Sequence, residues 1–333
     1  MNKPRVYVIG IGGSISCIGE SRLDLLNYNY ADRHLTIDEM IARVPEAREI
    51  ADIRAEQFLN IYGGDIAPAQ WLELARRIDR IFRDDSDAAG VVVTHGTSTL
   101  EETAYFLNLA VNSSKPVVIT GSMRPPTGLS TDADINLYDA IRVAACPEAA
   151  GKGALVVLNN EIQAARDVTK TNTSRVETFK SGELGFLGYA DSDGKVVFLR
   201  APAHAHTAAS EFCIDSIPAL PRVDIAYAYS GVDGVAVKAL VHARCAGIVS
   251  AGLGSGSAPR AYLDALGDAR DRGVCIVIAS QVGNGRVMAK RSFTEKGFLV
   301  ADNLAPKKAR ILLMLALAQT RDAAEIQRMM LTY

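Results

Sequence analysis

Short runs of apolar residues alternate with amphipathic stretches along most of the chain. The runs are continuous rather than interleaved with polar residues, which is typical of strands buried on both faces of a parallel sheet. They cover residues 6–11, 91–93, 116–120, 155–158, 225–229, 247–251 and 274–279. We therefore predict a buried strand at each of these positions.

Two further stretches show helical spacing. The first follows Pro68, a residue that suits the first turn of a helix, and carries its apolar residues on one face. These residues are Trp71, Leu74, Ala75, Ile78 and Phe82. The second stretch runs from Ala309 to Ala318, after Asn303 and Pro306. Helices that alternate with buried strands predict an α/β fold with a largely parallel sheet.

The alternation of strands and helices is interrupted between Asp191 and Val223. This segment is rich in Pro, Ala and Ser and has weak periodicity, as in Ala-Pro-Ala-His-Ala-His and Ile-Pro-Ala-Leu-Pro-Arg. Such a composition is typical of a linker between domains. We predict a larger N-terminal domain over residues 1–198, a linker over 199–222 and a smaller C-terminal domain over 223–333.

The composition excludes several classes of partner. The 333 residues are 48% hydrophobic, and 36 basic against 38 acidic residues leave a net charge of −2. With no run of like charges and few aromatic residues to stack bases, the chain does not suit nucleic acid. Its first apolar run is shorter than a signal-sequence core or a membrane span, and its five cysteines form no C-x-x-C pair. We expect a cytoplasmic protein with reduced cysteines and no membrane partner.

Three polar patches follow predicted strands, at the places where open α/β sheets bind ligands. The first is Gly10-Ile-Gly-Gly-Ser-Ile-Ser16, in which Ile15 stands where a dinucleotide-binding motif has its third glycine. The second is Thr94-His-Gly-Thr-Ser-Thr99, and the third is Arg166-Asp-Val-Thr-Lys-Thr-Asn-Thr173. The missing glycine argues against a nucleotide cofactor.

The second patch has two interpretations. Ser98 with Glu101, and Thr99 with Glu102, both have the spacing of a capping box, in which a hydroxyl and a glutamate satisfy free N–H groups at the start of a helix. Alternatively, the hydroxyls serve catalysis. The neighbouring His95 follows a buried strand and is interpreted as a packed, hydrogen-bonded residue rather than a catalytic one.

Together the three patches resemble the bacterial-type L-asparaginase and glutaminase amidohydrolases. The motifs that carry the resemblance cover nearly the whole chain in the family's order. They are Gly12-Gly-Ser-Ile-Ser, Thr94-His-Gly-Thr-Ser-Thr-Leu-Glu-Glu-Thr-Ala-Tyr-Phe-Leu, Lys115-Pro-Val-Val-Ile-Thr-Gly-Ser-Met-Arg-Pro, Arg166-Asp-Val-Thr-Lys-Thr-Asn-Thr, Gly247-Ile-Val-Ser-Ala-Gly and Lys307-Lys-Ala-Arg-Ile-Leu-Leu. The resemblance implies an N-terminal domain on a mixed, mainly parallel sheet and a smaller, flavodoxin-like C-terminal domain. It also implies a homotetramer of intimate dimers and a site that needs neither metal nor organic cofactor.

Four positions are expected to carry the catalysis. Hydrolysis of an amide without a metal needs an activated hydroxyl, a base to take its proton, and N–H donors for the developing oxyanion. In the resemblance, Ser14 replaces the family's first threonine, the nucleophile, and Thr97 matches its second. Lys170 matches the lysine that shares a proton with the second threonine. Tyr30 stands where the family has a loop tyrosine, and Tyr28 is the competing candidate.

The resemblance also divides the remaining polar residues of these motifs. Thr99 with Glu102 keeps the capping role, since Thr97 takes the catalytic one. Gly96, Asp65 and Ser122 match positions that contact the substrate.

The chain departs from the family where the amino-acid head group of asparagine would bind. Ser98 stands in place of an aspartate, and Gly63-Gly64 stand in place of Ser-Gln. Ser255 stands where the partner subunit's loop often supplies an asparagine. The segment 285–291 is basic where an acidic side chain would approach from the partner. We therefore expect a weakened grip on the α-ammonium and α-carboxylate groups.

The size of this loss bears on the substrate. Three missing charge-assisted contacts at roughly 1.5 kcal/mol each total about 4.5 kcal/mol, or on the order of a thousandfold in selectivity. The leading hypothesis is a hydrolase that cleaves the amide of a small carboxylated substrate other than free asparagine. The basic segment raises the further idea that an anionic group replaces the ammonium. The alternatives are an esterase or lactonase on the same scaffold, and a catalytically silent ligand-binding homologue.

Overall fold

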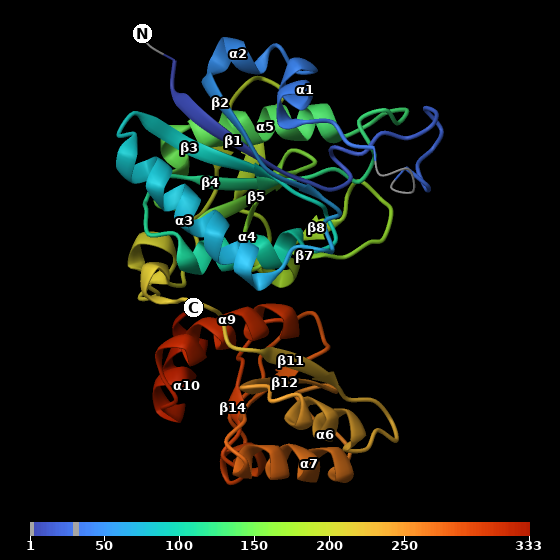
Figure 1. The fold of residues 1–333 in the computed structure, drawn as a ribbon, viewed down its shortest axis with the longest axis vertical. Coiled ribbons are helices and arrows are strands. Elements are labelled where there is room, and N and C mark those ends of the chain that lie inside the picture. The colour runs from blue at the N-terminus through green and yellow to red at the C-terminus, as the bar shows by residue number, and fades with distance from the viewer. Residues whose placement is uncertain (1–2, 29–32) are drawn as a thin grey trace. The chain divides into compact units, whose positions relative to one another are not determined.

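The computed structural model describes residues 3–28 and 33–333 of the chain. The chain divides into two compact units, Met1–Ile214 and Asp215–Tyr333 (Figure 1). Each unit has its own sheet with helices packed against it. The expected fold class, a larger α/β domain followed by a smaller one, is therefore confirmed.

The first unit is built on an eight-stranded mixed sheet with the order β10-β9-β6-β5-β4-β3-β1-β2. Neighbours from β2 to β5 pair in parallel, whereas β6, β9 and β10 are added antiparallel. The strands are β1 (Arg5–Gly12), β2 (Asp52–Ile61), β3 (Ala88–Thr94), β4 (Val117–Thr120), β5 (Ala154–Leu158), β6 (Glu161–Ala164), β9 (Gly188–Ala190) and β10 (Val196–Phe198). A separate hairpin pairs β7 (Thr169–Lys170) with β8 (Phe179–Lys180).

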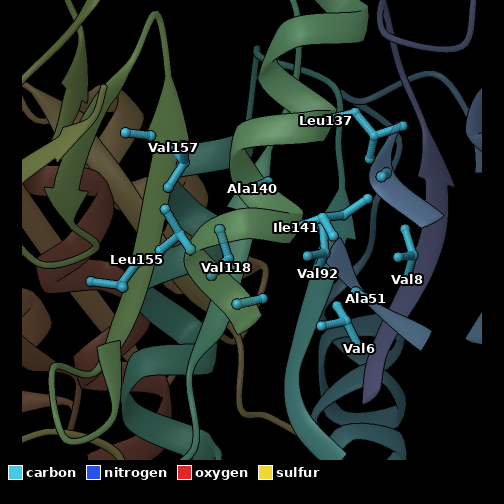
Figure 2. Packing of buried hydrophobic residues seen from close by; sticks show 14 of the residues in the cluster. Val6, Val8, Ala51, Val92, Val118, Leu137, Ala140, Ile141, Leu155 and Val157 are labelled. Atoms are coloured by element: carbon cyan, nitrogen blue, oxygen red, sulfur yellow. The ribbon is translucent and has the colours of Figure 1, made fainter. Parts of the chain in front are cut away.

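Helix α5 covers one face of this sheet. Its Leu137, Ala140 and Ile141 belong to one buried cluster with Val92 of β3 and Val118 of β4 (Figure 2). The helices of the unit are α1 (Ile37–Ala42), α2 (Ala47–Ile50), α3 (Pro68–Asp84), α4 (Leu100–Ala110) and α5 (Ala133–Ala145). Because α3 and α4 contact the same strands without joining that cluster, the sheet is covered on both sides. This explains why its central strands are continuous apolar runs.

Strand β2 is absent from the sequence-based prediction. It lies at the edge of the sheet, where β1 is its only partner strand among the described residues, and none of its ten residues is fully buried. An edge strand needs no apolar run, since one side of it has no neighbouring strand to pack with. Its mixed sequence Asp-Ile-Arg-Ala-Glu-Gln-Phe-Leu-Asn-Ile therefore shows no strand signal. The strand matters because it leads directly into Gly63 and Gly64.

The second unit has a four-stranded parallel sheet in the order β11-β12-β13-β14. The strands are β11 (Val223–Tyr227), β12 (Gly247–Gly252), β13 (Cys275–Ser280) and β14 (Leu299–Val300). The helices are α6 (Val235–His242), α7 (Arg260–Asp271), α8 (Arg291–Thr294), α9 (Pro306–Gln319) and α10 (Ala323–Thr332). Helix α9 contains the helical stretch predicted from Ala309 to Ala318 and begins three residues earlier, at Pro306. Across both units, no helix among the described residues combines the length and apolarity needed to span a bilayer.

The boundary between the units falls within the segment 199–222. This segment contains two short 3-10 helices, η3 (Thr207–Ala209) and η4 (Ile214–Ser216). The Ser210 hydroxyl donates to the Leu109 carbonyl at 2.5 Å, and the Arg76 guanidinium donates to the Ile214 carbonyl at 3.1 Å. These bonds attach the residues up to 214 to the first unit.

Candidate active site

Three glycines hold the loops after β1, β2 and β3 together. These strands are parallel neighbours in the sheet, so their carboxyl ends lie at one edge. A Cβ atom on Gly13 would lie 2.1 Å from the Cα of Gly96, and a Cβ on Gly63 would lie 2.5 Å from the same atom. Only residues without side chains allow backbones to approach so closely. The contact therefore brings Ser14, Gly64 and Thr97, which follow these glycines, into one region.

Thr97 and Lys170 are hydrogen bonded although 73 residues separate them in the chain. The Lys170 Nζ lies 2.8 Å from the Thr97 Oγ1. Thr97 is only 5% exposed, whereas Lys170 is half-buried on the short strand β7. A lysine at this distance can exchange a proton with the threonine hydroxyl, which is what a base for amide hydrolysis requires.

Ser14 lies close enough to Tyr28 to act on the pKa of its phenol. Burial raises the pKa of the Tyr28 phenol above its usual value, and the nearby Ser14 hydroxyl opposes that shift. Tyr28 therefore keeps its proton at neutral pH. Tyr30, the first choice for the loop tyrosine, lies outside the described residues. Tyr28, the competing candidate, lies near Ser14.

The prediction that Thr99 caps helix α4 is wrong. Thr99 occupies the cap position, but its side chain makes no capping hydrogen bond. Its hydroxyl donates instead to the carbonyl of Gly63. The bond ties the loop after β3 to the loop after β2, beside the Gly63–Gly96 contact. A capping pattern identifies a hydroxyl near the start of a helix. It does not reveal that the Gly63 carbonyl, from another part of the chain, lies within reach of that hydroxyl.

His95 is a buried neutral residue that orients the peptide before Thr97. Its Nδ1 lies 2.8 Å from the Gly96 carbonyl, and its Nε2 lies 2.8 Å from the Thr103 hydroxyl. Because the carbonyl can only accept, Nδ1 carries the proton and Nε2 accepts from Thr103. The Thr103 oxygen in turn accepts from Trp71 Nε1 at 2.8 Å. The carbonyl and N–H of a peptide point in opposite directions, so this chain of bonds also sets the direction of the Thr97 N–H.

His95 gives the first unit a specific acid sensitivity. Burial lowers its pKa to about 4, although the bond to the Gly96 carbonyl opposes the shift. The folded state therefore holds His95 neutral while the unfolded chain binds a proton below about pH 6.5. Stability that is fully present above that pH should fall by about 3 kcal/mol as the pH drops toward 4.

We predict that His95→Gln removes this part of the acid sensitivity. Glutamine does not titrate, so its urea midpoint should change less between pH 7 and pH 4.5 than that of the native chain. The comparison of the two pH values cancels any constant cost of the substitution. Equal losses of stability in both proteins would show that His95 is not the group that titrates.

The other expected binding residues differ in what their side chains can reach. Gly64, Asp65 and Ser98 are exposed at the edge of the sheet. Ser122 is fully buried, and its hydroxyl donates to the Arg124 carbonyl at 2.6 Å within its own turn. Its hydroxyl is thus engaged by the protein.

Ser255 lies in the second unit, on the loop after β12. Its hydroxyl and carbonyl both accept from Lys290. The neighbouring basic side chains are paired with carboxylates: Arg286 with Asp302, and Arg291 with Glu295 at 2.6 Å. Two of the three basic side chains of segment 285–291 are thus paired with carboxylates.

Gly13 and Thr103, which shape the loop that carries Thr97, were not identified from the sequence. The sequence identifies Gly13 only as part of a motif. Its φ of +87° and its contact with Gly96 require a glycine at this position. The Gly12-Gly13 pair directly after a strand was the available signal, since such turns often need positive φ. Thr103 had no signal, because its role depends on Trp71 and His95 meeting it across three segments.

Comparisons with known proteins agree across the whole chain. Residues 5–204 match a family model described as Asparaginase, N-terminal, and residues 222–330 match one described as Glutaminase/Asparaginase C-terminal domain. The chain is 43% identical to L-asparaginase 2 of Bacillus subtilis (strain 168) over 324 residues, which cover 97% of this chain and 85% of that protein. It is 42% identical over 327 residues to a probable periplasmic L-asparaginase of Haemophilus influenzae, covering 98% and 92%. The crystal structure of a probable cytoplasmic L-asparaginase from Campylobacter jejuni matches with a TM-score of 0.92 and 42% identity, covering 99% of this chain and 100% of that one.

Proposed function

This chain belongs to the asparaginase family and is an amidohydrolase that acts on C–N bonds, and we propose that its best substrate is a small carboxylated amide other than free asparagine. The observation that carries the proposal is the side chain next to Thr97. Ser98 is exposed there and offers a neutral hydroxyl instead of a carboxylate. Gly63 and Gly64, on the neighbouring loop, offer no side chain at all. An α-ammonium group therefore finds fewer charged partners in this part of the site.

The proposed chemistry uses two hydroxyls and one lysine. The Ser14 hydroxyl attacks the amide carbonyl, and Tyr28 lies beside that hydroxyl. Thr97 and Lys170 form the proton-transfer pair, supported by their 2.8 Å separation. As the Ser14 oxygen bonds to the carbonyl carbon, its proton passes to the Thr97–Lys170 pair, which returns a proton to the departing nitrogen as the C–N bond breaks. Water then attacks the acyl–Ser14 ester, releases the acid and restores the Ser14 hydroxyl. Water is consumed once, and the products are a carboxylate and an amine or ammonia.

The missing charge at position 98 leads to a direct test. Ser98→Asp should raise kcat/KM for asparagine by about tenfold or more, because a single charge-assisted contact is worth roughly 1.5 kcal/mol or more. Ser98→Asn is the matched control, since it has the same shape without the charge and should give no such gain. Ammonia release is measured for asparagine, glutamine and the corresponding amides without an amino group, such as succinamate.

The native protein is expected to prefer an amide without the free amino-acid head group. The proposal would be contradicted if the unmodified chain hydrolysed asparagine with a kcat/KM equal to or above that of every other amide in the panel. An unchanged asparagine efficiency in Ser98→Asp would separately show that position 98 does not contact the head group.

The proposal extends to assembly and location. A homotetramer of intimate dimers would let Ser255 of one protomer approach the catalytic residues of its partner, as the family resemblance suggests. The cytoplasm is proposed as the compartment, supported by five free cysteines. The matching Campylobacter jejuni structure is described as a cytoplasmic asparaginase, whereas the Haemophilus influenzae relative is named a periplasmic one. The compartment is therefore best decided by cell fractionation.

A further inference from the structure

Tyr62 stands at the start of the turn that carries Gly63 and Gly64. It directly follows β2, and the turn is closed by a bond from the Asp65 N–H to the Tyr62 carbonyl at 2.9 Å. The next residue, Gly63, is held by its contact with Gly96 and by the Thr99 hydroxyl. The backbone that carries Tyr62 is therefore fixed beside the loop of Thr97.

The ring of Tyr62 rests against the bare backbone of Gly64. A Cβ atom on Gly64 would lie 3.1 Å from Cε1 and 3.4 Å from Cδ1 of that ring. The first distance is tighter than an ordinary contact, so a side chain at position 64 would displace the ring. The absence of a side chain at Gly64 thus does more than remove a polar group. It makes room for an aromatic surface at the same place.

Much of this aromatic surface is open. Tyr62 is 49% exposed, and among residues 3–28 and 33–333 its ring has no stacked aromatic partner. The contacts of Gly63 and Gly13 with Gly96 place the turn of Tyr62 beside the loops of Ser14 and Thr97. An exposed ring backed by a rigid turn beside these loops is suited to contact a substrate rather than to stabilise the core.

We propose that Tyr62, supported by Gly64, is a specificity-determining residue that binds a planar aromatic group of the substrate. Offset or edge-on packing of two rings is favourable beyond the apolar area that it buries. The inference rests on the proposed function, because it assigns the substrate class of the same site: a carboxylated amide that bears an aromatic ring close to the amide. A ring near the amide would fill the space that an amino-acid head group does not occupy.

The test compares substrates that differ in the ring. Succinamate has none, phthalamate carries it on the acyl side, and N-phenylsuccinamate carries it on the nitrogen side. In the native protein, at least one aromatic amide should have a KM about tenfold lower than succinamate. Tyr62→Ala should raise that KM about tenfold, equivalent to roughly 1.4 kcal/mol, while kcat for it and both constants for succinamate stay within about twofold.

Two further variants separate the ring from its support. Tyr62→Phe should keep the aromatic preference, because the ring remains and only the hydroxyl is lost. Gly64→Ala should weaken the preference with Tyr62 intact, because the added methyl displaces the ring. Equal effects of Tyr62→Ala on aromatic and non-aromatic amides, or a native protein without aromatic preference, would overturn the inference. These outcomes concern the ratio of KM values between aromatic and non-aromatic amides. The proposed function fails on a different result, namely that asparagine is the best substrate.

Discussion

Replacing Thr97 by valine is expected to lower amide hydrolysis by on the order of a thousandfold, because acid–base catalysis of this kind contributes about 10²–10⁴ in rate. Valine keeps the shape of threonine and retains the methyl group that packs near Gly121. It removes only the hydroxyl that lies 2.8 Å from the Lys170 Nζ. The measurement is kcat with the best amide of the panel, together with a thermal unfolding scan to show that the fold is retained.

Lys170→Met should have a similar effect, and the double variant should be little worse than either single one. Residues that act as one unit show such non-additive losses. Thr171→Val is the matched control, since its hydroxyl donates to the Thr178 carbonyl within the β7–β8 hairpin at 2.8 Å. That variant should keep most of the activity. Additive losses for Thr97 and Lys170 would show that the two side chains act separately.

Gly13→Ala is expected to destabilise the first unit strongly. The new Cβ would lie 2.1 Å from the Cα of Gly96, and the residue would need a φ of +87°, which side chains rarely adopt. Overpacking costs about 1–3 kcal/mol and a strained backbone about 1–2 kcal/mol, so a loss of roughly 2–5 kcal/mol is expected. Activity should fall with it, because Ser14 is the next residue.

The two costs can be separated with matched glycines. Gly194 has nearly the same backbone angle, a φ of +84°, but a Cβ there would meet no atom within 4 Å. Gly194→Ala therefore measures the strain alone and should leave the activity unchanged. Gly63→Ala adds a Cβ 2.5 Å from the Gly96 Cα without a positive φ, and so measures the clash. Similar midpoints of thermal unfolding for Gly13→Ala and Gly194→Ala would show that the glycine contact is not tight in solution.

The central strands were predictable because their burial on both faces demands uninterrupted apolar residues. The strands around Val8, Val92 and Val118 were located in this way, and their side chains form the packed cluster against α5 (Figure 2). Strand β2 was not predictable by the same signal, since an edge strand leaves half of its surface uncovered. Without β2, the prediction misses part of the site as well as part of the fold, because β2 positions Gly63 and Gly64.

The site was predictable where a contiguous motif carries it. Thr97 and Lys170 were each found within a local pattern of hydroxyls, and the structure brings them into contact. The partner predicted for Thr99 is wrong, since a capping pattern takes account only of the residues that follow it, whereas the hydroxyl donates to the Gly63 carbonyl. Tyr62 was not predicted as a site residue, because an aromatic residue after an unrecognised strand has no distinctive pattern.

By itself, the sequence determined the α/β class, the central strands, the family and the residue types of the catalytic loops. Burial and local backbone geometry impose these patterns on neighbouring residues, so the patterns can be recognised in the sequence. The tertiary structure alone decided which loops meet. The strand order β3-β1-β2 differs from the order in the chain, and it brings Gly13, Gly63 and Gly96 together. The physical reason is that sheet order and close backbone approach depend on the packing of distant segments, which no local pattern specifies.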